Sequence, residues 1–505
     1  MWEDGRVPSP VEQRGRFLDV AVVLVPVLVA LAALAPFVAL DPIRGVTFSN
    51  GPFTDEAWYV ANARNWAVFG SFATDEWSLY LGSLPFAIVE GLVFRVFGVG
   101  LIQARLVDVA CVAATAGLIG GALRPLFGRG SAMLAGTGYA TCALILFHGR
   151  TAIVDPMSGL FLTAGLLTIT RIDGRRPGGW GVVGGACLAV AVMTKATTAP
   201  AVAVAIGVVV VAGLARPGAR RWAVAAIAVI GVAAISWLLA IALQNQKALA
   251  DMLDKIYPHL PRPTPRRLLH RLVAFIGSGF DGAAVLSAPL LVFAVAGFVA
   301  ALRRRRAMTT AALTLILATA AAFGVSMLAI ALAGYWPNRY AVTFTPLLAI
   351  LTAPATREVL RMSRSLAARR GSDARRASAA AVLIMAVVLV APGIWSQATW
   401  VAAAGHRVLD AQDESAAVLP DGSTVAGYYA PLLAMTSRAY AVVTCCEKVP
   451  VNAGDLYEAG ARWWADVEPP APATIPSGVW ARRELVTCVN DWSSRPRPLC
   501  LWRLP

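Results

Sequence analysis

The sequence predicts an all-α polytopic membrane protein followed by a small C-terminal α/β domain. Hydrophobic residues make up 58% of the 505 residues and charged residues only 14%, whereas soluble domains carry about 25% charged residues. Apolar runs recur as far as residue 397, after which the composition becomes mixed. Many of these runs approach the ~20 residues that a helix needs to cross a bilayer.

We expect about eleven transmembrane helices in a domain that covers residues 18–397. The first run is longer than the ~7–15-residue apolar core of a signal peptide, so it is expected to be an uncleaved anchor preceded by a cytoplasmic segment, 1–17. The apolar runs lie at 18–40, 105–123, 131–147, 156–170, 181–194, 199–215, 222–243, 284–302, 309–334, 340–356 and 379–397.

The net charge of +15 is concentrated in alternate loops. By the positive-inside rule these loops are cytoplasmic. The intervening segments, which include 41–104, 244–283 and 398–505, then face outward. Basic residues interleaved with aromatic residues, which a nucleic-acid groove requires, are not seen. The basic loop residues are Arg6, Arg14, Arg16, Arg124, Arg129, Arg171, Arg175, Arg176, Arg216, Arg220, Arg221, Arg303 to Arg306, and the arginines between Arg357 and Arg376.

The two long outward loops have distinct characters. In the first, 41–104, residues 55–69 have helical periodicity, and 81–100 is apolar but contains Pro85, Glu90 and Arg95, so both are expected to be helices in the membrane interface. The second, 244–283, carries a basic cluster that includes Arg266 and Arg267. This cluster fits either an anionic headgroup or phosphate, or a solvated loop.

The segment 398–505 is expected to be a soluble extracytoplasmic α/β domain, with a turn at 420–423 and a strand-like run at 440–444. Its oxidising location predicts one or two disulfides. A bond between adjacent cysteines is strained, so Cys445 and Cys446 are each expected to pair with Cys488 or Cys500. A metal site is the alternative. Cys111, Cys142 and Cys187 lie in apolar runs and are expected to pack there.

Polar residues recur at the outward ends of the predicted spans. Singly, each has a structural interpretation: a helix N-terminus for the acids, an interfacial anchor or a snorkelling side chain for the cations. Together, separated carboxylates and several cations on one face predict a site for an anionic substrate with hydroxyl groups. The residues are Asp55, Glu56, His148, Arg150, Asp155, Lys195, Tyr335, Asn338, Arg339 and Tyr340.

These residues resemble the GT-C membrane glycosyltransferases, in particular the protein O-mannosyltransferase and lipid A aminoarabinose transferase group. The resemblance covers about residues 18–350. It is carried by Asp55-Glu56-Ala57, Tyr59, Ala63-Arg64-Asn65, Leu84-Pro85, Phe97-Gly98, Arg105-Leu106, Arg150, Asp155 through Leu160, Lys195 and Pro200.

The resemblance implies a polyprenyl-phosphate sugar as donor and an envelope glycan, lipid or protein hydroxyl as acceptor. A phosphate leaves readily, so one general base and a set of cations suffice. Asp55 is expected to be the base. Asp155 is expected either to orient the acceptor or to support Asp55, and Glu56 is a weaker candidate for the same work. The phosphate-binding candidates are Lys195, Arg339, Arg150 and Tyr340, with Arg266 and Arg267 in reserve.

A single base opposite the leaving group implies inversion at the anomeric carbon. Binding of a divalent cation by Asp55 and Asp155 is an open alternative. The composition, rich in Ala, Val, Gly and Arg, indicates a bacterial plasma membrane. The alternative function is a transporter or flippase of a lipid-linked or anionic substrate, which is expected to carry its charges near mid-membrane. A nucleotide-sugar enzyme is disfavoured because no cytoplasmic loop is long enough for a doubly wound domain.

Overall fold

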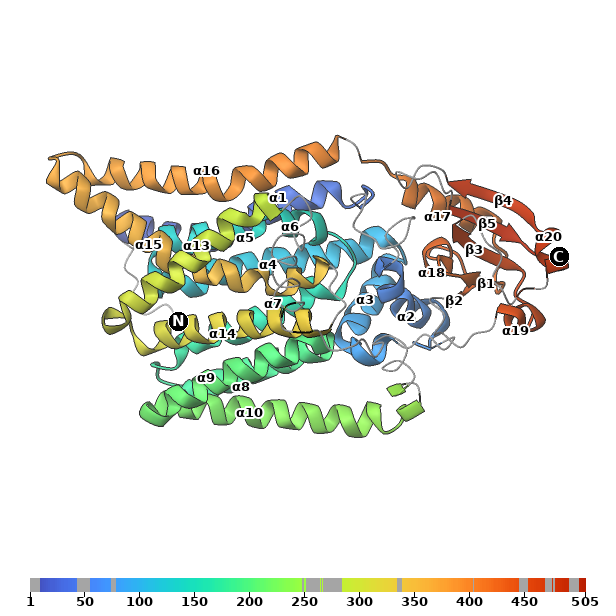
Figure 1. Cartoon of the computed structure of the whole chain (residues 1–505), viewed down its shortest axis with the longest axis horizontal. Coiled ribbons are helices and arrows are strands. Elements are labelled where there is room, and N and C mark those ends of the chain that lie inside the picture. The colour runs from blue at the N-terminus through green and yellow to red at the C-terminus, as the bar shows by residue number, and fades with distance from the viewer. Residues whose placement is uncertain are drawn as a thin grey trace.

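The structure, a computed structural model, consists of a long helical bundle with a smaller sheet-containing domain at one end (Figure 1). It describes residues 10–42, 55–73, 79–247, 249–250, 264, 266, 284–333, 338–402, 404–444, 453–467, 475, 477–489 and 499–505.

Each of the eleven predicted apolar runs contains a helix or a pair of consecutive helices. The bundle elements are α1 (Pro10–Leu34), η1 (Ala35–Phe37), α4 (Leu101–Phe127), α5 (Arg129–Ala140), α6 (Ala143–His148), α7 (Val154–Leu167), η3 (Thr168–Arg171), α8 (Pro177–Thr194), η4 (Ala196–Thr198), α9 (Ala199–Ala215), α10 (Pro217–Trp237), η5 (Leu238–Ala242), α13 (Ala284–Arg303), η6 (Arg305–Ala307), α14 (Thr310–Ala333), η7 (Asn338–Phe344), α15 (Thr345–Arg369) and α16 (Ala374–Val401).

Seven helical stretches of the described residues are long and apolar enough to cross a membrane. They begin at Phe17, Leu101, Pro177, Ala196, Pro217, Thr310 and Ala374. The polytopic helical fold predicted from the sequence is therefore confirmed. The count of eleven spans stays a prediction, because the other runs do not form helices that are both long and apolar enough; run 131–147, for example, is divided between α5 and α6.

The packing of the bundle fits a lipid solvent. The outer helices α10 and α16 expose large apolar side chains, among them Val232 and Leu383, which a water-facing surface of a soluble protein rarely does over such an area. Inside, small residues let helices approach closely. A methyl group at Gly297 of α13 would overlap the carbonyl oxygen of Leu351 in α15.

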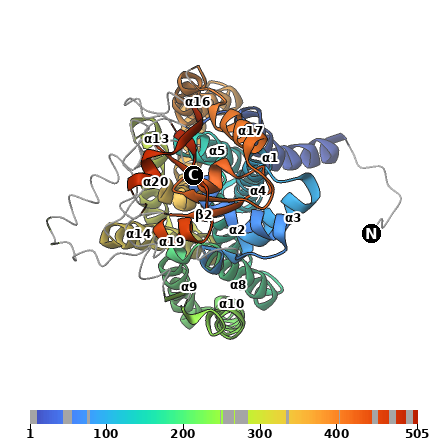
Figure 2. The ribbon, with the colours of Figure 1, turned by 90° about the vertical axis from the view of Figure 1, so that its right-hand side faces the viewer.

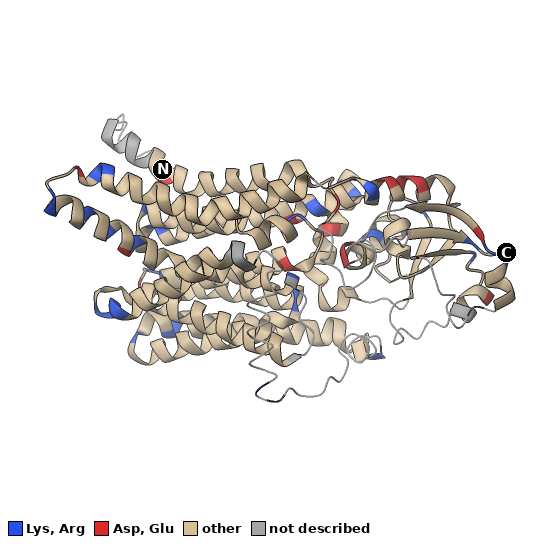
Figure 3. Ribbon diagram, turned by 45° about the horizontal axis from the view of Figure 1, so that its top comes forward, with Lys and Arg blue, Asp and Glu red and all other residues tan. Residues whose placement is uncertain are grey.

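Basic side chains gather at the loops of one end of the bundle, and the C-terminal domain lies at the other end (Figure 3). At the basic end Asp19 pairs with Arg124 and Arg129, each at 2.7 Å. The alternation of charge along the sequence thus corresponds to two distinct ends of the folded bundle.

Two further helices lie between the bundle and the C-terminal domain, α2 (Asp55–Phe69) and α3 (Leu84–Phe97), with the short η2 (Leu79–Gly82) between them. The predicted helices at 55–69 and 81–100 therefore both form. A proline in the first turn of α3 suits the unpaired amides there. Its end is set by Gly98, whose φ of 87° is readily adopted only by glycine.

The C-terminal domain faces the viewer in Figure 2, in front of the bundle. Its helices are α17 (Arg407–Val418), α18 (Ala430–Leu433), α19 (Ala453–Glu458) and α20 (Ser477–Ala481). Its strands are β1 (Thr424–Gly427), β2 (Tyr440–Val443), β3 (Trp463–Val467), β4 (Glu484–Val489) and β5 (Leu499–Arg503). The sheet order is β2-β1-β3-β5-β4, with β1 parallel to β2 and β3, and β5 antiparallel to β3 and β4. The α/β prediction is confirmed.

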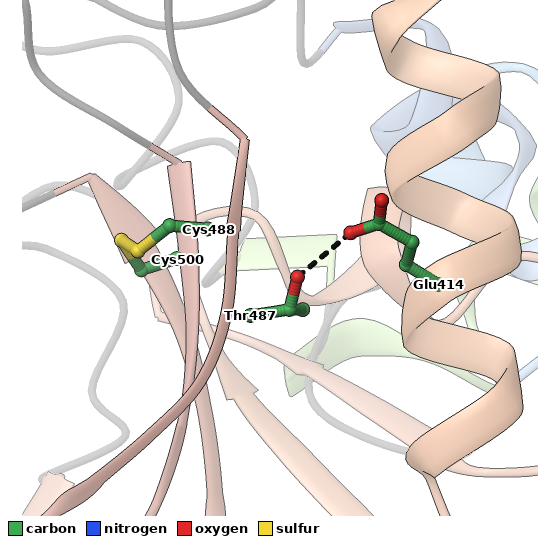
Figure 4. Close-up of a disulfide and its surroundings, with 4 residues drawn as sticks. All are labelled: Glu414, Thr487, Cys488 and Cys500. Atoms are coloured by element: carbon green, nitrogen blue, oxygen red, sulfur yellow. Dashed lines mark hydrogen bonds between the residues drawn. A yellow bond between two sulfur atoms is a disulfide. The ribbon is translucent and has the colours of Figure 1, made fainter.

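Among the described residues, a disulfide joins Cys488 to Cys500 (Figure 4). The prediction that these two cysteines pair with Cys445 and Cys446 is therefore wrong. The antiparallel register of β4 and β5 places Cys488 directly opposite Cys500, with their Cα atoms 4.1 Å apart. Cys445 and Cys446 lie outside the described residues.

The C-terminal domain is anchored to α2 and to the segment that follows η1. The Arg64 guanidinium of α2 donates hydrogen bonds to the carbonyls of Met435, Ser437 and Ala439, at 2.8 to 3.0 Å. The Asp41 carboxylate accepts the first two amides of α17, at 3.1 and 3.0 Å, which satisfies unpaired donors at a helix N-terminus. The domain and α2 thus hold each other in place.

We predict that Arg64→Met destabilises the docked C-terminal domain by about 3 kcal/mol or more, because three buried carbonyls lose a charged donor. The measurement is the rate at which protease cleaves the domain in purified protein. Arg438→Met is the matched control. Its side chain is 70% exposed, and it lies in the loop whose carbonyls Arg64 contacts. Equal protease resistance of the two variants would contradict the role of Arg64.

Candidate active site

Asp55 is the first residue of α2, and its side chain meets Arg339 of η7. The Asp55 Oδ2 to Arg339 Nη1 distance is 2.6 Å. Arg339 is 7% exposed and Asp55 is 16% exposed. A helix N-terminus favours a carboxylate, and the small exposure leaves Asp55 accessible to a substrate.

Asp155 lies in the first turn of α7 and is fully buried. Its Oδ1 pairs with the Lys195 ammonium, at the junction of α8 and η4, and accepts a hydrogen bond of 2.9 Å from the Thr343 hydroxyl of η7. Its Oδ2 is buried and accepts no hydrogen bond within the described part of the chain. One carboxylate oxygen therefore keeps acceptor capacity inside the site.

The two ion pairs form one cluster. The Tyr340 ring centroid lies 3.9 Å from Lys195 Nζ and 5.5 Å from the Arg339 guanidinium carbon. Burial raises the pKa of the Asp55 carboxyl; Arg339 opposes the rise and Asp155 adds to it. A carboxylate with a raised pKa is a stronger base once it has lost its proton. The cluster thus contains two carboxylates, two cations and an aromatic ring.

Glu56 is fully buried and forms a bidentate pair with Arg105, at 2.7 and 2.8 Å. Glu56 Oε1 also accepts the amide of Ala152 at 3.0 Å. Arg105 in turn donates to the carbonyls of Val38 and Leu40. Both Glu56 oxygens are engaged, so its contacts favour a structural role over orienting the acceptor or supporting Asp55 directly.

Arg150 is also placed differently from the expectation that it binds phosphate. Its guanidinium donates to the carbonyls of Phe37, Leu40 and Asp41 and lies 4.1 Å from the Trp400 ring centroid. These contacts support the chain where it leaves η1.

The remaining sequence candidates contribute little to the cluster. Burial, with Arg339 and Arg150 nearby, lowers the pKa of His148 to about 3, so this histidine is neutral at physiological pH. Arg266 is exposed, while Arg267 and Tyr335 lie outside the described residues.

The side chains of this cluster are poorly suited to coordinate a metal ion. Among the described residues no group of three or more His, Cys, Asp or Glu side chains is arranged to hold an ion. Asp55 and Asp155 are each paired with a cationic side chain. A phosphate could replace the carboxylates as the partner of Lys195 and Arg339. The described residues therefore suit a phosphate better than a divalent cation.

The contacts that support the site are not predicted by the sequence analysis. Thr343 and the carboxylate of Asp108, which accepts the Ile153 amide at 2.8 Å, both help to place Asp155. Their signal in the sequence is weak, since a threonine or a carboxylate in an apolar run has no fixed partner. Arg64 and Arg105 do occur within the motifs that carry the family resemblance.

Comparison with known proteins supports the same fold. The family model described as dolichyl-phosphate-mannose-protein mannosyltransferase matches residues 84–240. A search of curated protein sequences found no significant match.

Solved structures of GT-C proteins share the architecture. ArnT from Cupriavidus metallidurans bound to undecaprenyl phosphate has 16% identity and a TM-score of 0.62, covering 95% of this chain and 97% of that chain. The archaeal oligosaccharyltransferase AglB from Archaeoglobus fulgidus, in complex with an inhibitory peptide and a dolichol-phosphate, has 13% identity and a TM-score of 0.57, covering 89% and 69%. The arabinofuranosyltransferase AftD from Mycobacteria has 15% identity and a TM-score of 0.52, covering 97% and 40%. The chain therefore has the GT-C fold, and the resemblance predicted from its sequence is confirmed.

We predict that Glu56→Gln destabilises the protein by about 3–5 kcal/mol, because it leaves Arg105 buried without its counter-charge. Thermal unfolding of the purified protein measures this. Glu358→Gln is the control: its partners Arg304 and Arg361 are exposed, so about 1 kcal/mol or less is expected. A stable Glu56→Gln protein without activity would instead point to a direct catalytic role for Glu56.

Proposed function

We propose that this protein is an integral membrane glycosyltransferase that moves a sugar from a polyprenyl-phosphate donor to a hydroxyl group of an envelope glycan, lipid or protein. The observation that carries the proposal is the convergence of Asp55, Asp155, Lys195 and Arg339 from separate segments into one buried cluster. Lipid phosphates bound to ArnT and AglB, which share the fold, support the donor class.

The donor phosphate is proposed to replace carboxylates as the partner of the cations. Arg339 and Lys195 are each paired with a carboxylate in the structure. An arriving phosphate competes for both cations, since charged hydrogen bonds to phosphate are strong. Loss of the Arg339 contact leaves the Asp55 carboxylate free to accept a proton.

The proposed step is a displacement at the anomeric carbon. The acceptor hydroxyl gives its proton to Asp55 as its oxygen forms the new bond to the anomeric carbon. The bond from that carbon to the phosphate oxygen breaks, and the electron pair stays on the phosphate, where Lys195 and Arg339 neutralise it. Attack from the side opposite the leaving group inverts the anomeric configuration. Asp155 is proposed to orient the acceptor through its second oxygen.

The site and the C-terminal domain are proposed to face the extracytoplasmic side of a bacterial plasma membrane. The arginine-rich loops gather at the opposite end of the bundle (Figure 3), and such loops are retained in the cytoplasm.

Asp55→Asn keeps the shape of the side chain but cannot accept a proton. We expect turnover to fall by about 10²–10⁴-fold while the donor lipid still binds. Purified protein would receive polyprenyl-phosphate sugars and envelope acceptors, with product detected by mass spectrometry and its anomeric configuration determined by NMR. Near-normal turnover, or retention of configuration, would contradict the proposed base. Transport of lipid-linked sugar without any glycosidic product would favour the transporter.

Lys195→Gln and Arg339→Gln are each expected to lower kcat/KM for the donor by about 10²–10³-fold, as loss of a preorganised charge contact does. Lys247→Gln is the control, because Lys247 is an exposed cation of the same charge. If both cluster variants use the donor as well as the Lys247→Gln protein does, the phosphate assignment fails.

Orientation can be tested with single engineered cysteines at the two ends. In sealed right-side-out membrane vesicles, a membrane-impermeant maleimide is expected to label Asp421→Cys, in the C-terminal domain, and to label Arg370→Cys only after lysis. The opposite labelling pattern would overturn the proposed sidedness. Both positions are exposed.

A further inference from the structure

A cavity lies between α9, α13, α14 and α15. Its volume is about 1250 Å³, larger than the ~300–1,000 Å³ of pockets for drug-sized ligands. Its walls are apolar, with Val208 and Val211 on α9, Phe298 on α13 and Leu317 on α14. We call this cavity the arginine-end groove, because its mouth lies among the arginines of the basic loops.

The arginine-end groove has the depth of about one leaflet. On α9 its lining extends from Val204 to Arg216, and on α14 from Thr310 to Phe323. At 1.5 Å per residue these stretches are about 18–20 Å long, against about 30 Å for the whole hydrocarbon core. Lys195 of the catalytic cluster precedes Val204 by nine residues. The groove therefore ends inside the bundle, short of the catalytic cluster.

The mouth of the groove carries positive charge that the described residues do not balance. Arg216, Arg305 and Arg306 line the mouth, and an adjoining hollow of about 450 Å³ is formed by residues 302–307, which include four consecutive arginines. Of these four, Arg304 pairs with Glu358 at 2.9 Å. Within the described ranges no carboxylate pairs with Arg216, Arg305 or Arg306.

We propose that the arginine-end groove binds an anionic glycerophospholipid from the leaflet at this end of the bundle. The acyl chains fill the apolar groove, and Arg216, Arg305 and Arg306 hold the phosphate of a headgroup that carries no cation of its own. Basic pockets between transmembrane helices recognise such headgroups. The unbalanced arginines select an anionic lipid over a zwitterionic one. The single-leaflet depth and the mouth opposite the catalytic end fit a phospholipid better than a long polyprenyl chain.

The experiment is native mass spectrometry of the purified, delipidated full-length protein titrated with phosphatidylglycerol or with phosphatidylcholine of the same acyl chains. Wild-type protein is expected to retain phosphatidylglycerol more strongly. Arg305→Gln/Arg306→Gln is expected to weaken phosphatidylglycerol binding about 10-fold or more. The matched control, Arg175→Gln/Arg176→Gln, changes two arginines of another basic loop and is expected to bind as wild type.

A second pair of variants tests the apolar part of the groove. Gly207→Phe adds a ring where a Cβ meets open space and is expected to block both phospholipids. Gly231→Phe on α10 also enters open space but does not line the groove, and it serves as control. Equal phosphatidylglycerol binding by wild type and Arg305→Gln/Arg306→Gln would overturn the proposal. So would undecaprenyl phosphate displacing phosphatidylglycerol from wild type and losing affinity in both groove variants, which would assign the groove to the donor.

Discussion

The buried ion pair between Glu56 and Arg105 joins the parts of the chain that must meet for the catalytic cluster to exist. Glu56 is adjacent to Asp55 on α2, so fixing one carboxylate in the protein interior fixes the position of the other. Through the Ala152 amide the same carboxylate holds the segment that leads to Asp155. Arg105 extends the contact to the carbonyls that follow α1. A buried pair contributes little net stability but penalises arrangements that separate its members.

The C-terminal domain reinforces this arrangement from the other side. Arg64 binds three carbonyls of the domain from the same helix that begins with Asp55. The Trp58 indole donates to the Tyr428 carbonyl at 3.0 Å, and the two rings lie 4.6 Å apart. The helix that presents the proposed base is therefore held both by the bundle and by the domain.

Much of this architecture could be predicted because its signals are local. Apolar runs show where helices lie, and the spacing of residues in 55–69 gave α2 with its observed bounds. The convergence of Asp55, Asp155, Lys195 and Arg339 was also expected, since all follow or precede spans at one end. The partners of buried side chains were less accessible: Glu56 and Arg105 are 49 residues apart, and no periodicity connects them. Arg150 and the cysteines show the same limit, because the chain path around η1 and the register of β4 and β5 decide their contacts.

In the proposed mechanism, a lipid phosphate replaces Asp55 and Asp155 as the partner of Arg339 and Lys195, which leaves Asp55 able to accept a proton. A cryo-EM map of the full-length protein with a bound polyprenyl phosphate tests this most directly. We expect phosphate oxygens within hydrogen-bonding distance of the Lys195 ammonium and the Arg339 guanidinium, with the Arg339 to Asp55 contact broken. A phosphate bound away from these two cations, or bound while Asp55 stays paired with Arg339, would contradict the proposed mechanism.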